Sequence, residues 1–237
     1  MPDETDLSEE RSWLYEGRAK RAVASLQKMG INAQYVPTCA EALSAILEII
    51  PAGVRVVRGD SVTVDQVGIM PALKERKQNE VIDPFERDAS GNPLVAEVEE
   101  RRRMEKQAFS ADIFITGTNA VTLDGKLVST DALGNRVAPM LYGPEKVILV
   151  IGANKIVKDL DEALERIHEV CAPMNARRHA VKHHVKEFGE LPCARTGRCV
   201  DCTHDWRICR LTVIIEGTFV WARGRINVVL VGADLGI

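Results

Sequence analysis

Four cysteines lie close together near the carboxyl end of the sequence. They follow the spacing C-x5-C-x2-C-x6-C, and they are Cys193, Cys199, Cys202 and Cys209. Four thiolates that converge on one point can bind a single metal centre. The same residues could instead form two disulfides or remain reduced. Because the chain starts with acidic and polar residues and shows no charged-then-apolar leader, a cytoplasmic location is expected, where metal binding is favoured over disulfides.

The spacing of these cysteines leaves the identity of the metal open. One Cys-x-x-Cys pair is present, at residues 199–202, whereas a zinc ribbon normally shows two. The neighbouring Gly197 and Arg198 suit a loop that turns back and donates backbone N–H groups to sulfur. Zinc would make the loop, at about residues 193–209, a structural metal site that stabilises the fold. A [4Fe–4S] cluster would make it an electron-transfer site.

Size and composition indicate an ordinary globular protein. The chain has 237 residues, of which 46% are hydrophobic and 27% charged, and its formal net charge is −3. This balance gives no electrostatic reason to expect binding to nucleic acid. No apolar run approaches the ~20 residues needed to cross a bilayer, so no membrane span is expected.

Apolar runs of strand length alternate with helical patterns along the chain. This alternation predicts an α/β fold with a mainly parallel sheet flanked by helices, in one domain that covers residues 1–237 and carries the cysteine-rich loop as an insertion near the carboxyl end. The expected helices cover residues 13–29, 38–47, 67–76, 95–109, 137–141 and 160–170. The expected strands cover residues 33–36, 54–57, 81–82, 113–116, 126–128, 146–151, 211–215 and 226–231.

Several of these predicted strands end in turns rich in small and polar residues. Ligands of open parallel sheets bind at the carboxyl ends of the strands, although Gly, Ser, Thr and Asn are also what any such turn requires. Two cations beside these turns, Arg136 and Lys155, point to the carboxylate or phosphate of a small anionic metabolite. The candidate ligand-binding residues are Gly59, Ser61, Thr63, Thr116, Gly117, Asn119, Asn135, Arg136, Asn154 and Lys155.

Other reactive residue types give weaker signals. The histidines within residues 177–184 are expected on an exposed basic helix, although they could carry protons or bind metal. Cys39 and Cys171 are expected to be small buried hydrophobic residues. The sequence identifies no catalytic residue, and whether the chain is an enzyme stays open.

An ordered set of motifs resembles the LUD domain, a family named for lactate utilisation. The resemblance lies in residues 115–128, 134–138, 142–148 and 152–157, and it extends from about Gly17 to the carboxyl end. It implies a fold related to the NagB/RpiA/CoA-transferase group, whose members bind sugar phosphates, acyl-CoA or folate at the strand ends.

The resemblance also implies a set of functions. Some LUD proteins belong to a multi-subunit system that oxidises L-lactate with iron–sulfur partners. This association favours [4Fe–4S] over zinc, and it predicts a component of lactate or small hydroxy acid utilisation that works with iron–sulfur oxidoreductase subunits. The alternatives are a metal-stabilised binding protein or enzyme for a phosphorylated or CoA-like metabolite, and a regulatory or scaffold subunit.

Overall fold

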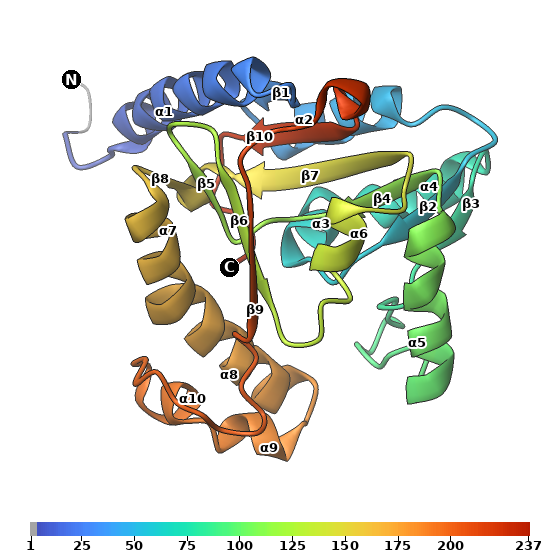
Figure 1. Ribbon diagram of the computed structural model, residues 1–237, viewed down its shortest axis with the longest axis vertical. Coiled ribbons are helices and arrows are strands. Elements are labelled where there is room, and N and C mark those ends of the chain that lie inside the picture. Colours follow the sequence, from blue (N-terminus) through green and yellow to red (C-terminus); the bar gives the residue numbers. More distant parts are fainter. Residues whose placement is uncertain (1–3) are drawn as a thin grey trace.

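The computed structural model describes residues 4–237, and a six-stranded parallel sheet forms its centre (Figure 1). The middle strands are buried along almost their whole length, which explains their continuous apolar sequences. The predicted α/β fold with a mainly parallel sheet is confirmed. In spatial order the strands are β1 (Asn32–Val36), β10 (Ile226–Val231), β7 (Lys146–Gly152), β4 (Ile113–Thr116), β2 (Arg55–Arg58) and β3 (Glu80–Ile82).

Helices cover both faces of this sheet because successive side chains of a strand point to opposite sides. Val147 and Leu149 of β7 belong to one apolar cluster with α1, while Ile148 and Val150 belong to a second cluster with α2, α3 and α4. These helices are α1 (Ser8–Lys28), α2 (Cys39–Ile49), α3 (Val62–Val67) and α4 (Ile69–Arg76).

The segment predicted as one helix at residues 67–76 is divided in the structure. Gly68 has φ 76°, a left-handed conformation that ends α3 and precedes α4. Glycine adopts this conformation without the steric penalty that a side chain would bring. The periodicity of the apolar residues continues across the break, which is why sequence reasoning missed it.

A smaller four-stranded sheet extends from the central sheet. A hairpin turns at Asp124–Gly125, and Ala120 pairs with Val128 across it in antiparallel register. In Figure 1 its strands β5, β6 and β9 run away from the central sheet and lie between two helical regions. Its strands, in spatial order, are β8 (Ile156–Val157), β5 (Ala120–Thr122), β6 (Leu127–Asp131) and β9 (Leu211–Ile215).

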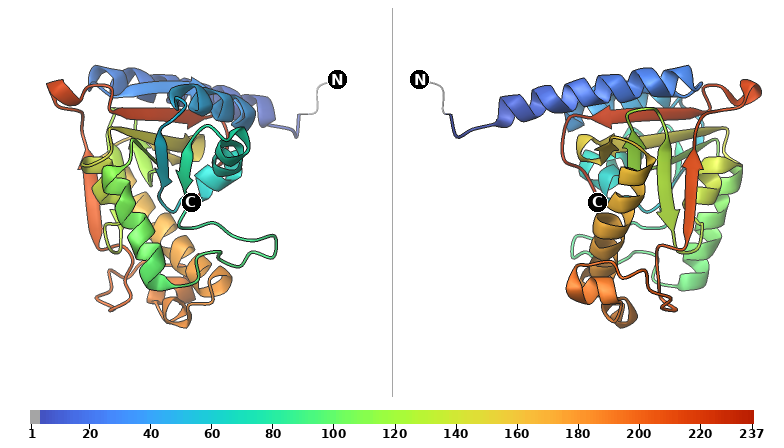
Figure 2. Two further views of the ribbon diagram at one scale, coloured as in Figure 1. Left: turned by 90° about the vertical axis from the view of Figure 1, so that its right-hand side faces the viewer. Right: turned by 60° about the vertical axis from the view of Figure 1, so that its left-hand side comes forward.

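One long helical segment lies beside the smaller sheet. The helix expected at residues 160–170 continues in the structure through a π-turn to Lys182, as α7 (Leu160–Arg166), η3 (Ile167–Cys171) and α8 (Ala172–Lys182). Pro173 lacks an N–H group, and the wider turn before it accommodates that interruption. Figure 2 shows this segment and α5 (Val98–Lys106) as separate projections below the central sheet.

Short helical elements complete the structure. They are α6 (Val137–Leu141), α9 (Lys186–Gly189), α10 (Pro192–Thr196), η1 (Gln107–Ser110), η2 (Ala153–Lys155) and η4 (Val220–Ala222). The cysteine-rich loop begins in α10 and ends just before β9. Within residues 4–237, no helix combines the length and the apolar character that crossing a membrane would require.

Candidate functional site

The parallel sheet brings the predicted polar turns together at the carboxyl ends of neighbouring strands. Strands β7, β4 and β2 lie side by side, so the turns that follow them meet at one edge. Lys155 Nζ donates to Thr63 Oγ1 over 3.1 Å, and Arg136 Nη1 donates to the carbonyl oxygen of Gly117 over 2.9 Å. We call this group of side chains the strand-end site; its charged and hydrogen-bonding members are Thr63, Asn119, Arg136, Lys155 and Arg166.

Two glycines allow these turns to approach one another. A Cβ atom at Gly59 would lie 2.8 Å from Phe114 Cζ and 3.0 Å from Thr116 Oγ1. A Cβ atom at Gly117 would lie 3.0 Å from Ser61 Oγ. A larger residue at Gly59 would force the Phe114 ring or the turn to move. Both glycines therefore keep the site compact, and their place in ligand binding stays a prediction.

Lys155 is a buried cation without an acidic partner. Its exposed fraction is 4%, and among residues 4–237 it forms no ion pair with a carboxylate. Within residues 4–237, Thr63 Oγ1 is the one hydrogen-bond partner of Lys155 Nζ. Burial first, and then the charge of Arg166, lowers the pKa of Lys155 from 10.5 to about 7. The amine is therefore partly neutral near pH 7, and an anion that reached it would favour the charged form.

Arg166 is the second cation at this position, and sequence reasoning missed it. Its Nη1 donates to the carbonyl oxygen of Asn119 over 3.0 Å and lies 2.6 Å from Cys171 Sγ, while its Nε donates to the carbonyl oxygen of Asn154. Within the described chain, its Nη2 group has no hydrogen-bond partner. In the sequence Arg166 stands in a charged helix between Glu165 and Ile167, which resembles a solvated helix face.

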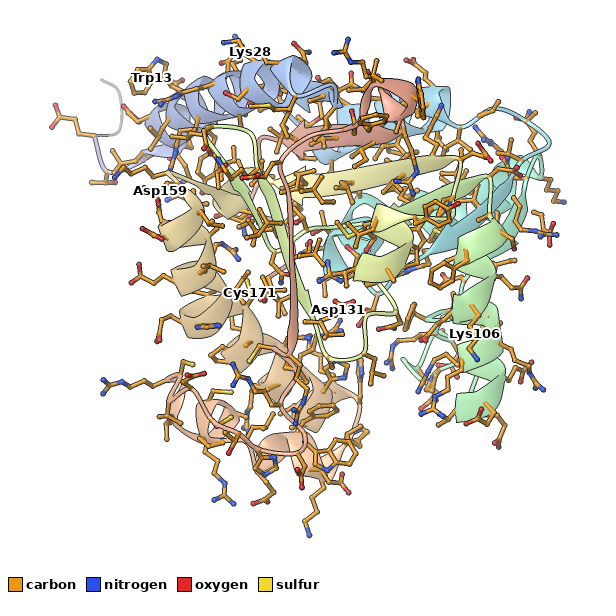
Figure 3. The ribbon with its side chains drawn as sticks, in the orientation of Figure 1. Trp13, Lys28, Lys106, Asp131, Asp159 and Cys171 are labelled. Carbon is orange, nitrogen blue, oxygen red and sulfur yellow. The ribbon has the colours of Figure 1, made fainter. Side chains whose placement is uncertain are left out.

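Cys171 differs in part from the expectation of a small buried hydrophobic residue. It is buried, with an exposed fraction of 3%, but its sulfur contacts the guanidinium of Arg166. Figure 3 labels Cys171 at the junction of α7 and α8, and Asp131 at the far end of β6. The π-turn of η3 carries the sulfur at this junction. The contact with Arg166 is polar, which a helix pattern alone does not reveal.

Arg136 is held firmly by the protein. Its Nε donates to Asp131 Oδ1 over 3.0 Å, and its Nη2 donates to Asn119 Oδ1 and to the carbonyl oxygen of Thr130. Asp131 also accepts from the backbone N–H groups of Arg136 and Val137 over 2.9 Å. Sequence reasoning selected Arg136 as a ligand cation and missed Asp131. The structure gives Arg136 a clear positioning role, because it joins the ends of β4 and β6.

The remaining predicted residues lie around this centre. Ser61 Oγ accepts from Val64 N and caps α3, and Asn154 Oδ1 accepts from Leu235 N over 3.1 Å. Asn135 bonds to Glu105 of α5. Thr116 Oγ1 is the single fully buried side-chain oxygen or nitrogen of the described residues without a hydrogen-bond partner. This oxygen lies beside Gly59, where an added Cβ atom would approach it to 3.0 Å.

A second charged group stands beside the end of β2. Arg178 of α8 forms an ion pair with Asp60. Burial alone would raise the pKa of Asp60, but the charge and hydrogen bond of Arg178 hold it below its ordinary value. The pKa of His179 and that of His183 are lowered to about 4, first by burial. The expectation of exposure is therefore wrong for these two half-buried residues, because their rings pack against each other and His179 also packs against Phe188.

The cysteine loop, residues 193–209, contains four free, half-buried thiols. The backbone N–H of Asp201 donates to Cys199 Sγ over 3.4 Å, and Arg207 Nε donates to Cys209 Sγ over 3.2 Å. Burial first, and then the neighbouring thiols of Cys202 and Cys209, raises the pKa of Cys193. Three of the sulfurs are therefore close enough to interact electrostatically.

Four thiols, two of which accept N–H hydrogen bonds, suit a soft metal or an iron–sulfur cluster. Over residues 4–237, however, no three or more His, Cys, Asp or Glu side chains are arranged as a metal site. Aromatic contacts hold the loop against the helices. Trp206 of the loop contacts Phe188 edge-on, with ring centroids 5.2 Å apart, and the ring centroids of Phe188 and His179 are 5.0 Å apart. Metal binding by the loop stays a prediction.

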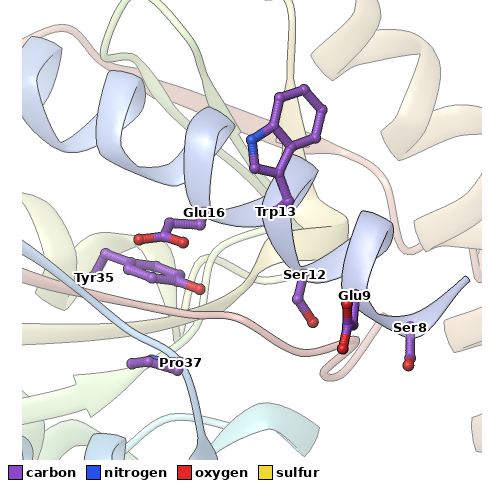
Figure 4. Close-up of a pocket in the computed structure, with 7 residues that line it drawn as sticks. All are labelled: Ser8, Glu9, Ser12, Trp13, Glu16, Tyr35 and Pro37. Carbon is purple, nitrogen blue, oxygen red and sulfur yellow. The ribbon is translucent and has the colours of Figure 1, made fainter. Parts of the chain in front are cut away.

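A shallow groove lies elsewhere on the molecule, between α1 and the end of β1. Figure 4 shows its lining, which includes Glu9, Glu16 and Tyr35. The seven lining residues contain two carboxylates and no basic side chain. Such a surface repels anions, so it does not match the anionic ligand that the strand-end site suits.

Comparisons with known proteins identify the family. None of the curated proteins matches this chain. A crystal structure of a DUF162 family protein from Deinococcus radiodurans is similar to it, with 13% sequence identity and a TM-score of 0.48, over 93% of this chain and 98% of the other. The LUD domain family matches residues 19–231. The chain therefore belongs to the LUD domain family.

Proposed function

We propose that this LUD-domain chain binds the carboxylate of a small 2-hydroxy acid such as L-lactate at the strand-end site. In this proposal it is a component of hydroxy acid utilisation that works with iron–sulfur electron-transfer partners. The observation that carries the proposal is the pair of cations, Lys155 and Arg166, which meet without a carboxylate among the described residues. Neighbouring cations repel, and one anion between them would relieve that repulsion.

The chemistry of each group suits one part of a carboxylate ligand. The free Nη2 edge of Arg166 is a planar donor that matches a carboxylate oxygen. The ammonium form of Lys155 supplies a compact charge, and Thr63 shares a hydrogen bond with it. The unpaired hydroxyl of Thr116 lies at the same sheet edge and could bond to a ligand hydroxyl.

The enclosed position of Lys155 favours a small ligand over a CoA-like one. The residue is 4% exposed, and the backbone at Gly236 covers it so closely that a Cβ atom there would lie 2.8 Å from Lys155 Nζ. A ligand of lactate size needs only a local movement of residues 234–236. An acyl-CoA would need a far larger opening.

The cysteine loop supplies the second part of the proposal. Oxidation of a 2-hydroxy acid to a 2-oxo acid releases two electrons and two protons, so it requires an electron acceptor. Four thiols, two of which accept hydrogen bonds at sulfur, favour a [4Fe–4S] cluster, with zinc as the alternative. Cys193, Cys199, Cys202 and Cys209 would hold the group, and a bound cluster would exchange electrons with partner subunits.

Calorimetric titration tests the binding part. L-Lactate should bind the wild-type chain, and Arg166→Gln should weaken binding by about tenfold or more, because an uncompensated charge–carboxylate contact contributes about 1.5–3 kcal/mol. Arg177→Gln, on the exposed side of α8, is the matched control and should bind like wild type. If a sugar phosphate or acetyl-CoA binds and L-lactate does not, the hydroxy acid assignment is wrong.

A further inference from the structure

We propose that Lys155 forms a covalent imine with the carbonyl carbon of a small 2-oxo acid whose carboxylate is held by Arg166. This inference rests on the proposed function, since a 2-oxo acid is the oxidised form of a 2-hydroxy acid. It adds a covalent step and a residue that performs it.

The first requirement for an imine is a neutral amine that no acid holds in the charged form. Lys155 satisfies it, because it is buried and has no carboxylate partner among residues 4–237. Arg166 and Arg136 both disfavour its protonation, which supports a pKa of about 7. Lysines next to another cation in a desolvated site are the ones that react with carbonyl compounds near neutral pH.

The second requirement is a set of groups that orient the carbonyl. Charged or titratable groups face Lys155 from three other segments: Arg166 from α7, Cys171 from the π-turn, and Arg136 from the turn before α6. The guanidinium of Arg136 donates hydrogen bonds from all three of its nitrogens, to Asp131, Gly117, Asn119 and Thr130. Among the described residues, the Nη2 group of Arg166 has no such partner. Arg166 is therefore the group available for the carboxylate.

The third requirement is a path for protons. Thr63 Oγ1 lies 3.1 Å from Lys155 Nζ and is within reach of an oxygen bonded to the carbonyl carbon. The amine attacks that carbon, and the carbonyl oxygen takes up a proton to give a carbinolamine. The C–O bond then breaks, and the oxygen leaves as water with a second proton. The amine loses two hydrogens and the oxo acid loses its oxygen, so no oxidant or reductant is needed.

Access to the amine depends on the last described residues. Gly236 lies against Lys155 and Thr63, and its N–H donates to Gln66 Oε1 over 2.6 Å. Leu235 N donates to Asn154 Oδ1 over 3.1 Å. Each of these bonds is a single neutral contact. Local opening of residues 234–236 breaks these two bonds and the one that Tyr15 Oη donates to Asp234 Oδ1, and it takes Leu235 out of its apolar cluster. This opening exposes the amine to a small acid.

Reductive trapping tests this inference. The wild-type chain is incubated with pyruvate and sodium borohydride, and its intact mass is measured before the modified peptide is mapped. We expect a mass increase of one reduced pyruvate adduct, located on Lys155. Its yield should rise between pH 6 and 8, since the neutral amine is the reactive form. L-Lactate has no carbonyl group and should give no adduct.

Matched variants complete the experiment. Lys155→Met should abolish the adduct, while Lys158→Met, whose side chain is 80% exposed in the wild type, should keep it. Absence of an adduct on wild-type Lys155, or equal labelling of other lysines, would overturn the inference without any variant. L-Lactate calorimetry separates the two proposals: lactate binding without pyruvate trapping removes the imine and leaves the proposed function intact.

Discussion

The strand-end site and the cysteine loop carry the two chemically distinctive groups of this chain, and they are organised in different ways. Hydrogen bonds of the strand-end site join residues far apart in the sequence, such as Thr63 with Lys155 and Gly117 with Arg136. Bonds of the cysteine loop join near neighbours, such as Asp201 with Cys199. The fold itself therefore fixes the first region, while the second depends on local contacts.

This difference predicts how each region responds to change. A site fixed by the fold keeps its geometry without a ligand, and it can retain an unfavourable feature such as an unpaired cation. A loop with local contacts gains order when a metal joins its ligands, so metal binding contributes to its stability. Substitutions in the strand-end site should thus alter the stability of the whole domain, and substitutions in the loop should alter metal content first.

Loss of Asp131 should have the largest effect on the fold. Asp131→Ala removes the acceptor for Arg136 and for two backbone N–H groups, and leaves a largely buried guanidinium without its counter-charge. We expect the free energy of unfolding to fall by about 3–5 kcal/mol, measured by urea denaturation. Asp205→Ala, an exposed position in the cysteine loop, should change it by less than about 0.5 kcal/mol. Equal effects would contradict the contrast between the regions.

The cysteine loop should show the opposite behaviour. The chain purified without oxygen should contain iron and sulfide, with broad absorbance typical of an iron–sulfur cluster, and Cys202→Ser should lose most of that metal while the main unfolding transition remains. Cys39→Ser, at the start of α2, is the matched control and should keep the metal. One zinc per chain would exclude the electron role, and a metal-free wild type would exclude the centre altogether.

Replacing Lys155 should stabilise the protein. Lys155→Met removes a buried cation that lacks an acidic partner, so the free energy of unfolding at pH 7 should rise by about 1 kcal/mol. Because the folded pKa of about 7 lies below the ordinary 10.5, the wild type gains stability as pH rises between these values, and the advantage of the variant should shrink. Lys158→Met should show neither effect. A destabilised Lys155→Met would mean that the amine is better compensated than its contacts indicate.

The half-buried histidines should leave stability at neutral pH unchanged and produce an effect confined to acidic pH. His179 and His183 have folded pKa values lowered to about 4 against an ordinary 6.5, so the unfolded chain binds their protons first. Stability should fall as pH drops from 6.5 to 4, and less so in His179→Gln. His184→Gln, at an exposed position, is the control. NMR titration would contradict this if His179 gained its proton near its ordinary pKa.

The sequence predicted the elements of the central sheet well because their signals are local. Apolar runs bounded by Gly, Asn or Asp identified β4, β7 and β10, and parallel topology explained why their turns meet. The break at Gly68 was missed, since the apolar period continues through it. The continuity of α7 with the basic helix predicted near residues 177–184 was missed, because a π-turn has no simple sequence pattern.

The candidate site was predicted only in part for a related reason. Lys155 stood out beside a glycine-rich turn, but its lack of an acidic partner is a property of the three-dimensional surroundings. Arg166 and Cys171 come from a helix that looks solvated in the sequence. Arg136 looked equivalent to Lys155, although Asp131 compensates its charge. Charge alone could be read from the sequence, whereas the pairing of charges required the fold.

A double-mutant cycle for L-lactate binding tests the central claim most directly. Dissociation constants are measured by calorimetry for wild type, Lys155→Met, Arg166→Gln and the double variant. If both cations hold one carboxylate, each single variant should lose about tenfold or more in affinity, and the double variant should lose less than the sum of the two free-energy changes. Wild-type affinity in both single variants would contradict a shared anion-binding site.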